Sequence, residues 1–266
     1  MSIVPYEFIR VEKKGHVAII TINRPEVMNA LHPPTDKEMD DAFNDFDADP
    51  DAWVAILTGA GDRAFSAGND LKWQAQHGGK ALHDARLGLK GGLGGITFRF
   101  DLFKPLIAAV NGLALGGGFE CALACDIIIA SENASFGLPE PTVGMIAGAG
   151  GVHFLPRAIP FHQAMGMLLT ARRISAQEAL QMGLVNQVVP LEQLMPTAEA
   201  WAEKILACSP LAIRASKEAA LKGLTMPLEQ AARTRFPGQV TLYQSEDFVE
   251  GPKAFAEKRK PQWKGK

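Results

Sequence analysis

The chain has 266 residues, 47% hydrophobic and 21% charged, a balance typical of a globular protein and not of a disordered or collagen-like chain. Lysine and arginine number 27 and aspartate and glutamate 29, so the net charge of −2 lacks the basic excess of a protein that wraps nucleic acid. No apolar run approaches the ~20 residues of a membrane span, and residues 1–10 do not resemble a secretory signal. We expect a cytoplasmic protein without a nucleic-acid or membrane partner.

The first part of the chain alternates short strands with helices. Two strands are predicted at residues 8–12 and 17–22, and the sequence from Thr35 to Glu38 has the pattern of a capping box at the start of a helix. Further strands are predicted at residues 53–58, 106–111 and 126–130. This alternation favours an α/β fold.

Residues 77–95 differ from their surroundings because they contain seven glycines. Glycine at this density lowers the stability of a helix, so we expect a mobile loop with a weak helical centre. Such a loop is either a tolerated surface insertion or a lid beside a functional site, and the sequence does not decide between them.

The chain changes character near residue 190. Ser175 to Glu178 is a second predicted capping box, and beyond Leu191 the pattern is helical, with helix starts at Ser209-Pro210 and Met226-Pro227. We therefore divide the chain into a β/α core that carries the active site, residues 1–190, and a C-terminal helical region, residues 191–266.

The helical region has more apolar side chains than it should cover alone. We therefore expect it to be buried between subunits of an oligomer. Examples of these side chains are Leu194, Trp201, Ile205 and Leu221.

The chain contains three cysteines, Cys121, Cys125 and Cys208. This sparse, odd number gives no disulfide framework and is typical of a reducing compartment. Cys121 and Cys125 are four residues apart, but no histidine or further cysteine is near them, so small core side chains are favoured over metal ligands. We expect no metal site.

The densest functional signal is the segment from Asn111 to Asp126. A strand leads into three glycines, residues 116–118, and then into a helix of small residues. The first N–H groups of a helix lack partners and its dipole favours negative charge there, so this pattern predicts an anion site; the alternative is a tight structural turn. Glu120 lies three residues after Gly117, on the same face of the helix.

Two other segments carry weaker signals. The turn from Phe65 to Asp70 is flanked by a strand and a predicted helix, and it could offer a second backbone N–H. Glu140 stands among apolar residues, glycines and prolines, so we expect burial to raise its pKa; the alternative is an exposed loop glutamate.

Together these segments resemble the crotonase (enoyl-CoA hydratase/isomerase) superfamily. The resemblance covers essentially the whole chain. The matching motifs are Ala67-Gly68-Asn69-Asp70, Ile107 through Asp126, Phe136 through Glu140, Gly148 through Gly151, Leu169 through Ala176, and the tail from Ser245 to Arg259. One departure is Ala147, where many hydratases have proline, which leaves acyl specificity open.

The resemblance implies an α/β fold in which a spiral of β-β-α turns precedes a C-terminal helical region. It also implies a homotrimer or homohexamer that binds acyl-CoA thioesters, with CoA as part of the substrate and no separate cofactor. Residues are carried over by position. The backbone N–H groups of Asn69 and Gly117 would form an oxyanion hole, Glu120 and Glu140 would be catalytic, and Ala67, Asp70, Phe255 and Lys258 would contact CoA.

Both catalytic glutamates are present, which favours a hydro-lyase that adds water to a 2,3-enoyl thioester or removes it. The family precedent has the residue at the position of Glu140 protonating carbon, although the sequence itself does not separate acid from base. The alternatives are a Δ3,Δ2-enoyl-CoA isomerase or another crotonase-type acyl-CoA enzyme, and an acyl-CoA binding protein without catalysis. For Phe255 and Lys258 the alternative is an ordinary amphipathic terminal helix.

The tail looks most like the carnitinyl-CoA dehydratase branch of the superfamily. The acyl chain itself has no readable code in the sequence. We expect the loop at residues 77–95 and a helix after Phe98 to shape the acyl pocket.

Overall fold

The computed structural model describes residues 6–266. Within this range, the longer strands form a six-stranded sheet in the order β1-β2-β3-β5-β7-β10, in which β1 and β2 pair antiparallel and the others are parallel. The bounds are Ile9–Lys14 (β1), Val17–Ile22 (β2), Val54–Gly59 (β3), Leu106–Val110 (β5), Ile127–Ser131 (β7) and Gln187–Val189 (β10). The strands predicted in this part of the chain are confirmed to within one or two residues.

A second sheet, β4-β6-β8-β9, is built from shorter strands. Its members are Ala64–Ser66 (β4), Leu113–Leu115 (β6), Ser135–Gly137 (β8) and Ile174–Ser175 (β9). Strands β3, β5 and β7 of the first sheet are each followed by one strand of the second sheet and then by helical structure. This repeated β-β-α turn is the spiral that the resemblance implies, and the α/β class is confirmed.

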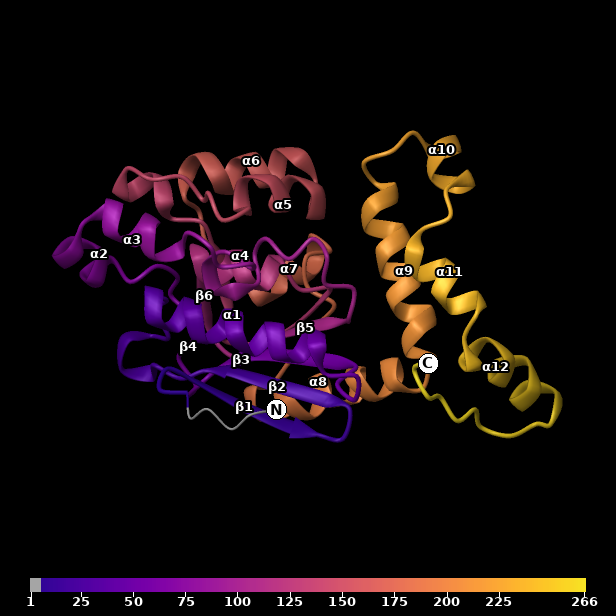
Figure 1. The fold of residues 1–266 in the computed structure, drawn as a ribbon. Coiled ribbons are helices and arrows are strands. Elements are labelled where there is room, and N and C mark those ends of the chain that lie inside the picture. The colour runs from indigo at the N-terminus through magenta and orange to yellow at the C-terminus, as the bar shows by residue number, and fades with distance from the viewer. Residues whose placement is uncertain (1–5) are drawn as a thin grey trace.

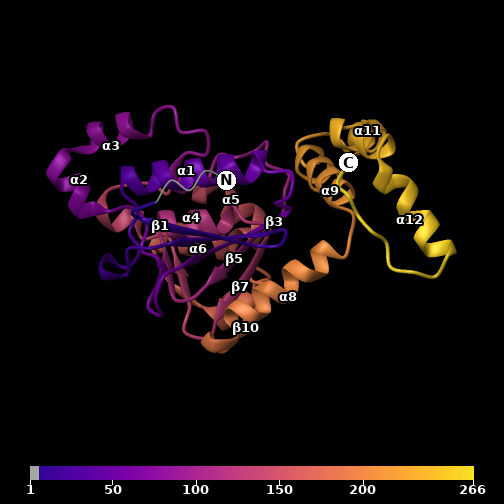
Figure 2. The same ribbon diagram turned by 60° about the horizontal axis from the view of Figure 1, so that its bottom comes forward.

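Alternate residues of the first sheet face two different apolar layers, because side chains point to opposite faces along a strand. One face packs with α1 (Pro33–Ala48) and α4 (Gly117–Leu123) in a cluster that includes Leu57, Ala108 and Phe43. The other face, with Ile56 and Ala109, packs against α8 (Leu194–Leu206). Figure 2 shows α1 and α8 on opposite sides of the sheet.

Helix α1 begins earlier than its predicted capping box. Its N-cap is His32, whose Nδ1 accepts the backbone N–H of Thr35 at 3.3 Å, and Pro33 occupies the first turn. Burial lowers the pKa of His32 to about 4, so the ring stays neutral and can accept this bond. Glu38 instead accepts the backbone N–H groups of Glu7 and Phe8. The predicted role of Thr35 as the cap is therefore wrong.

The second predicted capping box is confirmed. The Ser175 side chain accepts the N–H of Glu178, and the Glu178 side chain accepts the N–H of Ser175, at the start of α7 (Ala176–Gln181). Ser209 likewise caps the helix that begins at Pro210.

Two segments near the second sheet differ from their predictions in detail. Residues 77–95 contain helix α3 (Gly79–Arg86) and the 3-10 turn Leu93–Gly95, preceded by α2 (Leu71–His77), so the segment is more helical than expected. The helix expected after Phe98 is absent from the described residues, which pass through turns into β5. Lys104 and Pro105 precede that strand.

Helices α5 (Gly151–Ala158) and α6 (Phe161–Thr170) lie near α4, and the chain then returns under the sheet as α8 (Figure 1). Leu194 is 2% exposed, and Trp201 and Ile205 pack partly against the same cluster. The expectation of missing cover within one chain is therefore wrong for Leu194, which the sheet covers. Trp201, Ile205 and Leu221 line an open, mostly apolar hollow, and Leu221 is 45% exposed, so for these three burial between subunits stays a prediction.

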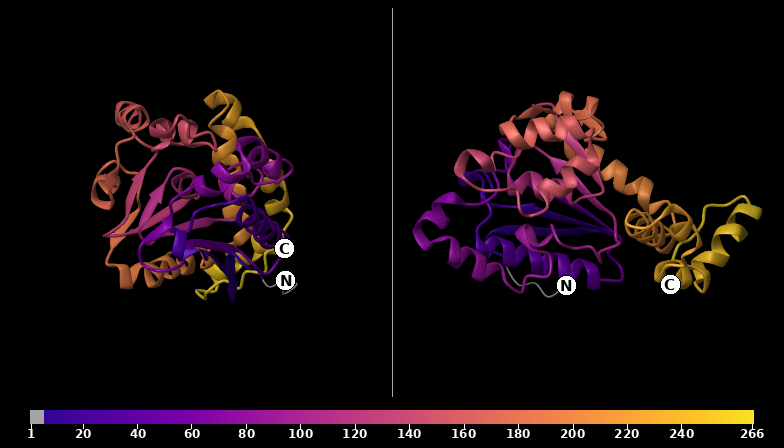
Figure 3. Two further views of the ribbon diagram at one scale, coloured as in Figure 1. Left: turned by 90° about the vertical axis from the view of Figure 1, so that its left-hand side faces the viewer. Right: turned by 90° about the horizontal axis from the view of Figure 1, so that it is seen from above.

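The last helices project as a separate arm, residues 210–266, from the rest of the described chain, residues 6–209, which we call the body. They are α9 (Pro210–Gly223), α10 (Leu228–Arg233), α11 (Pro237–Tyr243) and α12 (Glu246–Ala256). Figures 1 and 3 show this arm standing beside the sheets with the C-terminus folded back along it. None of the helices in residues 6–266 is both long and apolar enough to cross a membrane. The division of the chain at residue 190 stays a prediction.

Candidate active site

Two glycine turns meet beside the start of α4. Gly68, with φ of +83°, lies so close to the β6–α4 turn that a Cβ on it would be 2.5 Å from Leu115 O and 2.7 Å from Gly117 N. Gly116 at the head of α4 has φ of +53° and a non-helical ψ of −129°. Only glycine combines this backbone conformation with this close approach. The contact sets Asn69, the residue after Gly68, beside Gly117.

The backbone N–H groups of Asn69 and Gly117 are the predicted oxyanion donors. An ideal Cβ on Gly117 would lie 3.6 Å from Asn69 N, so the two groups are neighbours in space. Within residues 6–266 neither N–H has a hydrogen-bond acceptor. The N–H of Gly117 is one of the four at the start of a helix that lack an internal partner. Two unused donors at one point form a site for a developing negative charge.

These donors open onto a cavity of about 450 Å³. Its walls come from the α2–α3 segment, the Gly-rich turn after it, α4, and the segment after β8. The lining residues are Asn69, Gln74, Leu82, His83, Arg86, Leu87, Gly88, Leu89, Gly92, Leu93, Phe98, Gly117, Glu120, Glu140, Met145, Ile146, Gly148 and Ala149. The prediction that residues 77–95 shape a pocket is confirmed.

Glu120 lies on α4, one turn beyond Gly117, and is only 2% exposed. Its Oε1 accepts the backbone N–H of Gly151 at 2.8 Å, at the start of α5. Burial raises the pKa of Glu120 to about 7, and the nearby charge of Glu140 adds to the rise. A carboxyl group with this pKa can exchange a proton near neutral pH.

Glu140 reaches the same cavity from the 3-10 turn Glu140–Val143, which follows β8. Its Oε1 would lie 2.9 Å from a Cβ on Gly116, so this glycine makes room for the carboxyl group. Its Oε2 is buried and has no hydrogen-bond partner within the described residues. Burial raises the pKa of Glu140, as the sequence predicts. An unpartnered carboxyl oxygen in a cavity is available to a ligand or to water.

The structure brings four of the predicted site residues together: Asn69, Gly117, Glu120 and Glu140. Asp70 is beside them, but its carboxylate binds Arg24 at 3.1 Å and caps α2 through the N–H of Trp73. Ala67 donates its N–H to Met28 O. Their predicted contacts with CoA stay predictions.

Phe255 lies in the last turn of α12 and Lys258 just after that helix, in the arm and away from α4 (Figure 1). Phe255 is 88% exposed. Neither residue lines the cavity, so within one chain they are separated from the two glutamates. A contact with CoA at this cavity requires a second subunit or a long ligand.

The sequence did not single out Arg86 or Gln74, which also line the cavity. No local motif marks them, because the partners of Arg86 are distant in sequence.

The cysteines are placed as expected for core residues: Cys121 is fully buried and Cys125 half-buried. No three His, Cys, Asp or Glu side chains within residues 6–266 are grouped as metal ligands would be.

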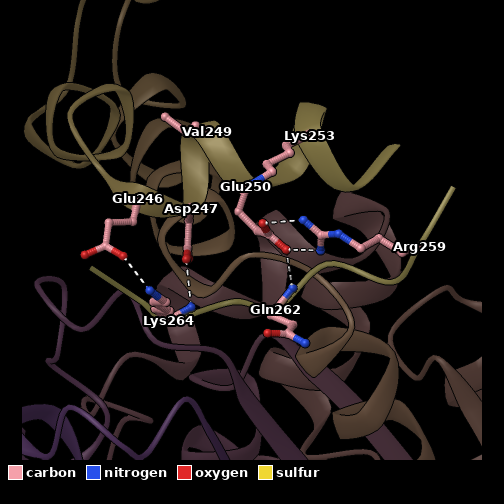
Figure 4. A pocket seen from close by; sticks show the side chains of 8 residues that line it. All are labelled: Glu246, Asp247, Val249, Glu250, Lys253, Arg259, Gln262 and Lys264. Carbon is pink, nitrogen blue, oxygen red and sulfur yellow. Dashed lines mark hydrogen bonds and ion pairs between the residues drawn. The ribbon is translucent and has the colours of Figure 1, made fainter. Parts of the chain in front are cut away.

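A second cavity, of about 580 Å³, lies between α12 and the chain end, where six of its eight lining side chains are charged. Figure 4 shows that these charges pair with one another: Glu250 accepts from Arg259, and Glu246 from Lys264. Asp247 accepts the backbone N–H of Lys264 at 2.8 Å. These bonds hold the C-terminus against α12, and the cavity contains neither glutamate of the first site.

Comparison with known proteins agrees with this geometry. A family model described as enoyl-CoA hydratase/isomerase matches residues 12–266. A carnitinyl-CoA dehydratase of Salmonella typhi is 46% identical over 264 residues, which cover 98% of this chain and 99% of the relative.

Two solved structures are also similar over nearly their whole length. An enoyl-CoA hydratase from Bacillus anthracis is 39% identical with a TM-score of 0.91, covering 98% of this chain and 100% of that one. An enoyl-CoA hydratase from Mycobacterium marinum is 39% identical with a TM-score of 0.90, covering 97% and 99%.

Proposed function

The chain belongs to the enoyl-CoA hydratase/isomerase family, and we propose that it is a hydro-lyase that adds water to a 2,3-enoyl-CoA thioester or removes it. The observation that carries the proposal is the meeting of two carboxyl groups, Glu120 and Glu140, in one cavity with two backbone N–H groups that have no acceptor in the described part of the chain. Relatives named as hydratases and dehydratases support the same reaction class.

The thioester oxygen accepts the N–H groups of Asn69 and Gly117. When water adds to C3, negative charge develops on this oxygen as the enolate forms. Donors that are already in place stabilise the charge without reorganisation, and loss of one donor in such a site typically costs ~3–4 kcal/mol.

The two glutamates divide the proton transfers. The N–H of Gly151, which Glu120 accepts, partly offsets the rise in pKa that burial causes, so we assign Glu120 as the base that takes a proton from water. Oε2 of Glu140 has no hydrogen-bond donor within residues 6–266, so we assign Glu140 as the acid that protonates C2. The water oxygen bonds to C3 as the C2–C3 double bond becomes single, one proton moves from water to Glu120, and C2 takes the proton of Glu140. Loss of a proton from Glu120 to solvent and uptake of one by Glu140 then restore the starting state. The dehydration is the same path reversed.

CoA enters as part of the substrate in this proposal, and no other cofactor takes part. The pantetheine and nucleotide would extend out of the cavity past Ala67 and Asp70. We propose a homotrimer or homohexamer, in which Phe255 and Lys258 of one arm approach the nucleotide. The free cysteines suit the reducing cytoplasm, where we place the enzyme.

Two classes of acyl chain are candidates for binding in the cavity. Its apolar lining, with Leu82, Leu87, Leu93, Met145 and Ile146, favours an uncharged acyl chain. The relatives named carnitinyl-CoA dehydratase favour a chain that ends in a trimethylammonium group. A comparison of turnover on short, branched, aromatic and carnitinyl thioesters decides between them.

The function is tested by incubating crotonyl-CoA with the protein in ¹⁸O-labelled water. We expect loss of the enoyl absorbance and one labelled oxygen in a 3-hydroxyacyl product. A Δ3,Δ2-isomerase would move the double bond of a 3-enoyl thioester without taking up label. Binding of acyl-CoA without turnover of any thioester in the panel would favour the non-catalytic alternative and overturn the proposal.

A further inference from the structure

The segment that contains α2 and α3 forms one wall of the acyl cavity but buries few side chains against the rest of the molecule. No residue of either helix is buried, although Leu82, His83 and Arg86 line the cavity. Figures 1 and 3 show the two helices at the edge of the molecule, away from the arm. Burial of apolar side chains therefore contributes little to holding this wall, and specific polar contacts must do so.

Arg86, the last residue of α3, makes the inward contacts. Its side chain is 17% exposed, and its Nε donates to Oδ2 of Asp36 at 2.7 Å. Its Nη2 donates to Oδ1 of Asn69 at 3.0 Å. The three residues come from α3, from the first turn of α1, and from the oxyanion turn. One guanidinium therefore joins three segments that are far apart in sequence.

Asp36 connects this contact to the other oxyanion donor. Its side chain is fully buried, and its second oxygen, Oδ1, accepts the N–H of Gly94 at 2.8 Å. Gly94 follows Leu93, whose methyl groups lie 3.0 Å from the position of a Cβ on Gly117. The buried carboxylate thus fixes the turn that packs against Gly117.

The side chain of Asn69 is held at both ends. Its Nδ2 donates to Oε1 of Gln74 on α2 at 2.6 Å, while its Oδ1 accepts from Arg86 on α3. The backbone N–H of the same residue is one of the two free oxyanion donors. A shift of the turn that carries this donor would therefore break side-chain contacts of Asn69 with both α2 and α3.

We propose that Arg86 is a positioning residue that couples closure of the α2–α3 segment over the acyl cavity to the placement of the Asn69 N–H. The proposal rests on the function proposed above. When the Arg86 contacts are intact, the wall is closed and the donor is fixed. When they are absent, Asp36 is left as a buried, unpaired carboxylate, a state that proteins avoid by local opening or protonation.

The coupling is tested with two variants of Arg86 and a matched control. Arg86→Met removes the ion pair and the bond to Asn69 while keeping the length of the side chain. Arg86→Lys keeps a cation for Asp36 but cannot donate to Asp36 and Asn69 in the same fork. Lys80→Met breaks the exposed ion pair of Lys80 with Asp84 on the same helix and leaves the cavity untouched.

The measurements are hydrogen–deuterium exchange of residues 67–95 and steady-state hydration of crotonyl-CoA. For Arg86→Met we expect faster exchange across this segment and at least a tenfold loss of kcat. For Arg86→Lys we expect exchange near that of the wild type in α3 and a smaller loss of kcat with little change in KM. Lys80→Met should match the wild type in both.

The exchange measurement does not depend on the reaction, so the two proposals can fail separately. Unchanged exchange in folded Arg86→Met overturns the coupling even if hydration falls. Full kcat in both Arg86 variants overturns it as well. If the wild type hydrates no thioester while exchange rises in Arg86→Met alone, the proposed reaction fails and the structural link between Arg86 and Asn69 stands.

Discussion

The body of the molecule and its C-terminal arm differ in how far they cover their own apolar side chains. In the body, both faces of the six-stranded sheet are covered within one chain, by α1 and α4 on one side and by α8 on the other. In the arm, Leu224, Leu228 and Phe255 are 83%, 85% and 88% exposed. The body also exposes apolar side chains, such as Leu169 at 72% and Ile146 at 68%, but it covers both faces of its sheet. The most exposed large apolar side chains of residues 6–266 lie in the arm.

The difference separates two tasks. The four groups assigned to the reaction lie in the body, at turns fixed by Gly68, Gly116 and the buried contacts around Asp36. The arm holds Phe255 and Lys258, which one chain cannot bring to the cavity. Exposed apolar surface of this kind marks contact sites on other proteins, so the arm suits packing against another subunit. Changes in the two regions should therefore have separable effects on chemistry and on assembly.

The largest expected effect is loss of chemistry from the body. Glu120→Gln and Glu140→Gln each remove a group that transfers a proton and should lower kcat for hydration by ~100-fold or more. The amide keeps the size of the carboxyl group, so the fold, acyl-CoA binding and assembly should be retained. Rates are measured with crotonyl-CoA, and binding by calorimetry. Turnover near that of the wild type in either variant would remove that residue from the mechanism.

The next effect tests the oxyanion turn. In Gly117→Val the new Cβ would lie 3.0 Å from the methyl groups of Leu93 and 3.6 Å from Asn69 N. The rest of the valine side chain would then occupy the space where the thioester should sit. We expect most activity and acyl-CoA affinity to be lost while circular dichroism stays that of a folded protein. Loss of one oxyanion donor typically costs about 10²–10³ in kcat, and a displaced donor should fall in this range.

Gly79→Val is the matched control for this change. A Cβ on Gly79 meets only Gln74 Nε2, at 3.8 Å, and its backbone is not in the left-handed region. This variant should keep its activity. Equal turnover by the two variants would place the oxyanion hole elsewhere.

Most residues of the candidate site could be named from the sequence because they belong to short local motifs that match the superfamily. The glycines before α4, and Glu120 one turn later, belong to one short strand–turn–helix unit. Glu140 follows another short strand, and its burial could be anticipated from its apolar neighbours. The β-β-α order follows from the resemblance, and the strands follow from their apolar pattern.

The errors share a physical cause, which is dependence on distant contacts. Thr35 and Glu38 have the pattern of a capping box, but Glu38 instead caps two N–H groups at the start of β1, and buried His32 takes the capping role. Leu194 was expected at a subunit contact and is covered by the sheet. The role of Arg86 could not be predicted from a local pattern, because its partners Asp36 and Asn69 are 50 and 17 residues away in the sequence.

Assembly is the property that the arm should control. Replacing both Leu224 and Leu228 by lysine puts two charges on the most exposed apolar part of the α9–α10 connection. We expect the proposed trimer or hexamer to dissociate toward monomers in light scattering, because burying an unpaired charge is costly. Glutamate-dependent hydration should persist at a reduced rate, since the cavity lies in the body.

Glu12→Lys on the edge strand β1 is the control for added positive charge, because this residue is exposed on the body. It should leave the assembly unchanged. A wild-type protein that is monomeric at working concentration would contradict the prediction and would also remove the basis for contacts between the arm and a nucleotide bound to another subunit.

The smallest expected effect is a pH-dependent gain of stability in Glu120→Gln. Burial holds the pKa of Glu120 at about 7 in the folded protein, against 4.5 as its ordinary value. The folded state thus resists ionisation, so this residue destabilises the fold progressively as the pH rises from about 4.5 to about 7. Raising a pKa from 4.5 to about 7 corresponds to roughly 3 kcal/mol. Glutamine does not ionise and still offers an oxygen to Gly151 N–H.

Chemical denaturation of the wild type and of Glu120→Gln should therefore give similar free energies of unfolding at pH 4 and a difference of roughly 1–3 kcal/mol in favour of the variant at pH 8. Glu229→Gln is the control, because the Glu229 side chain is 80% exposed on the arm and should show no such trend. A difference that stays constant between pH 4 and pH 8 would contradict a raised pKa for Glu120. The gain at high pH, together with the loss of turnover, would show that the body keeps a destabilising buried carboxylate because the reaction uses it.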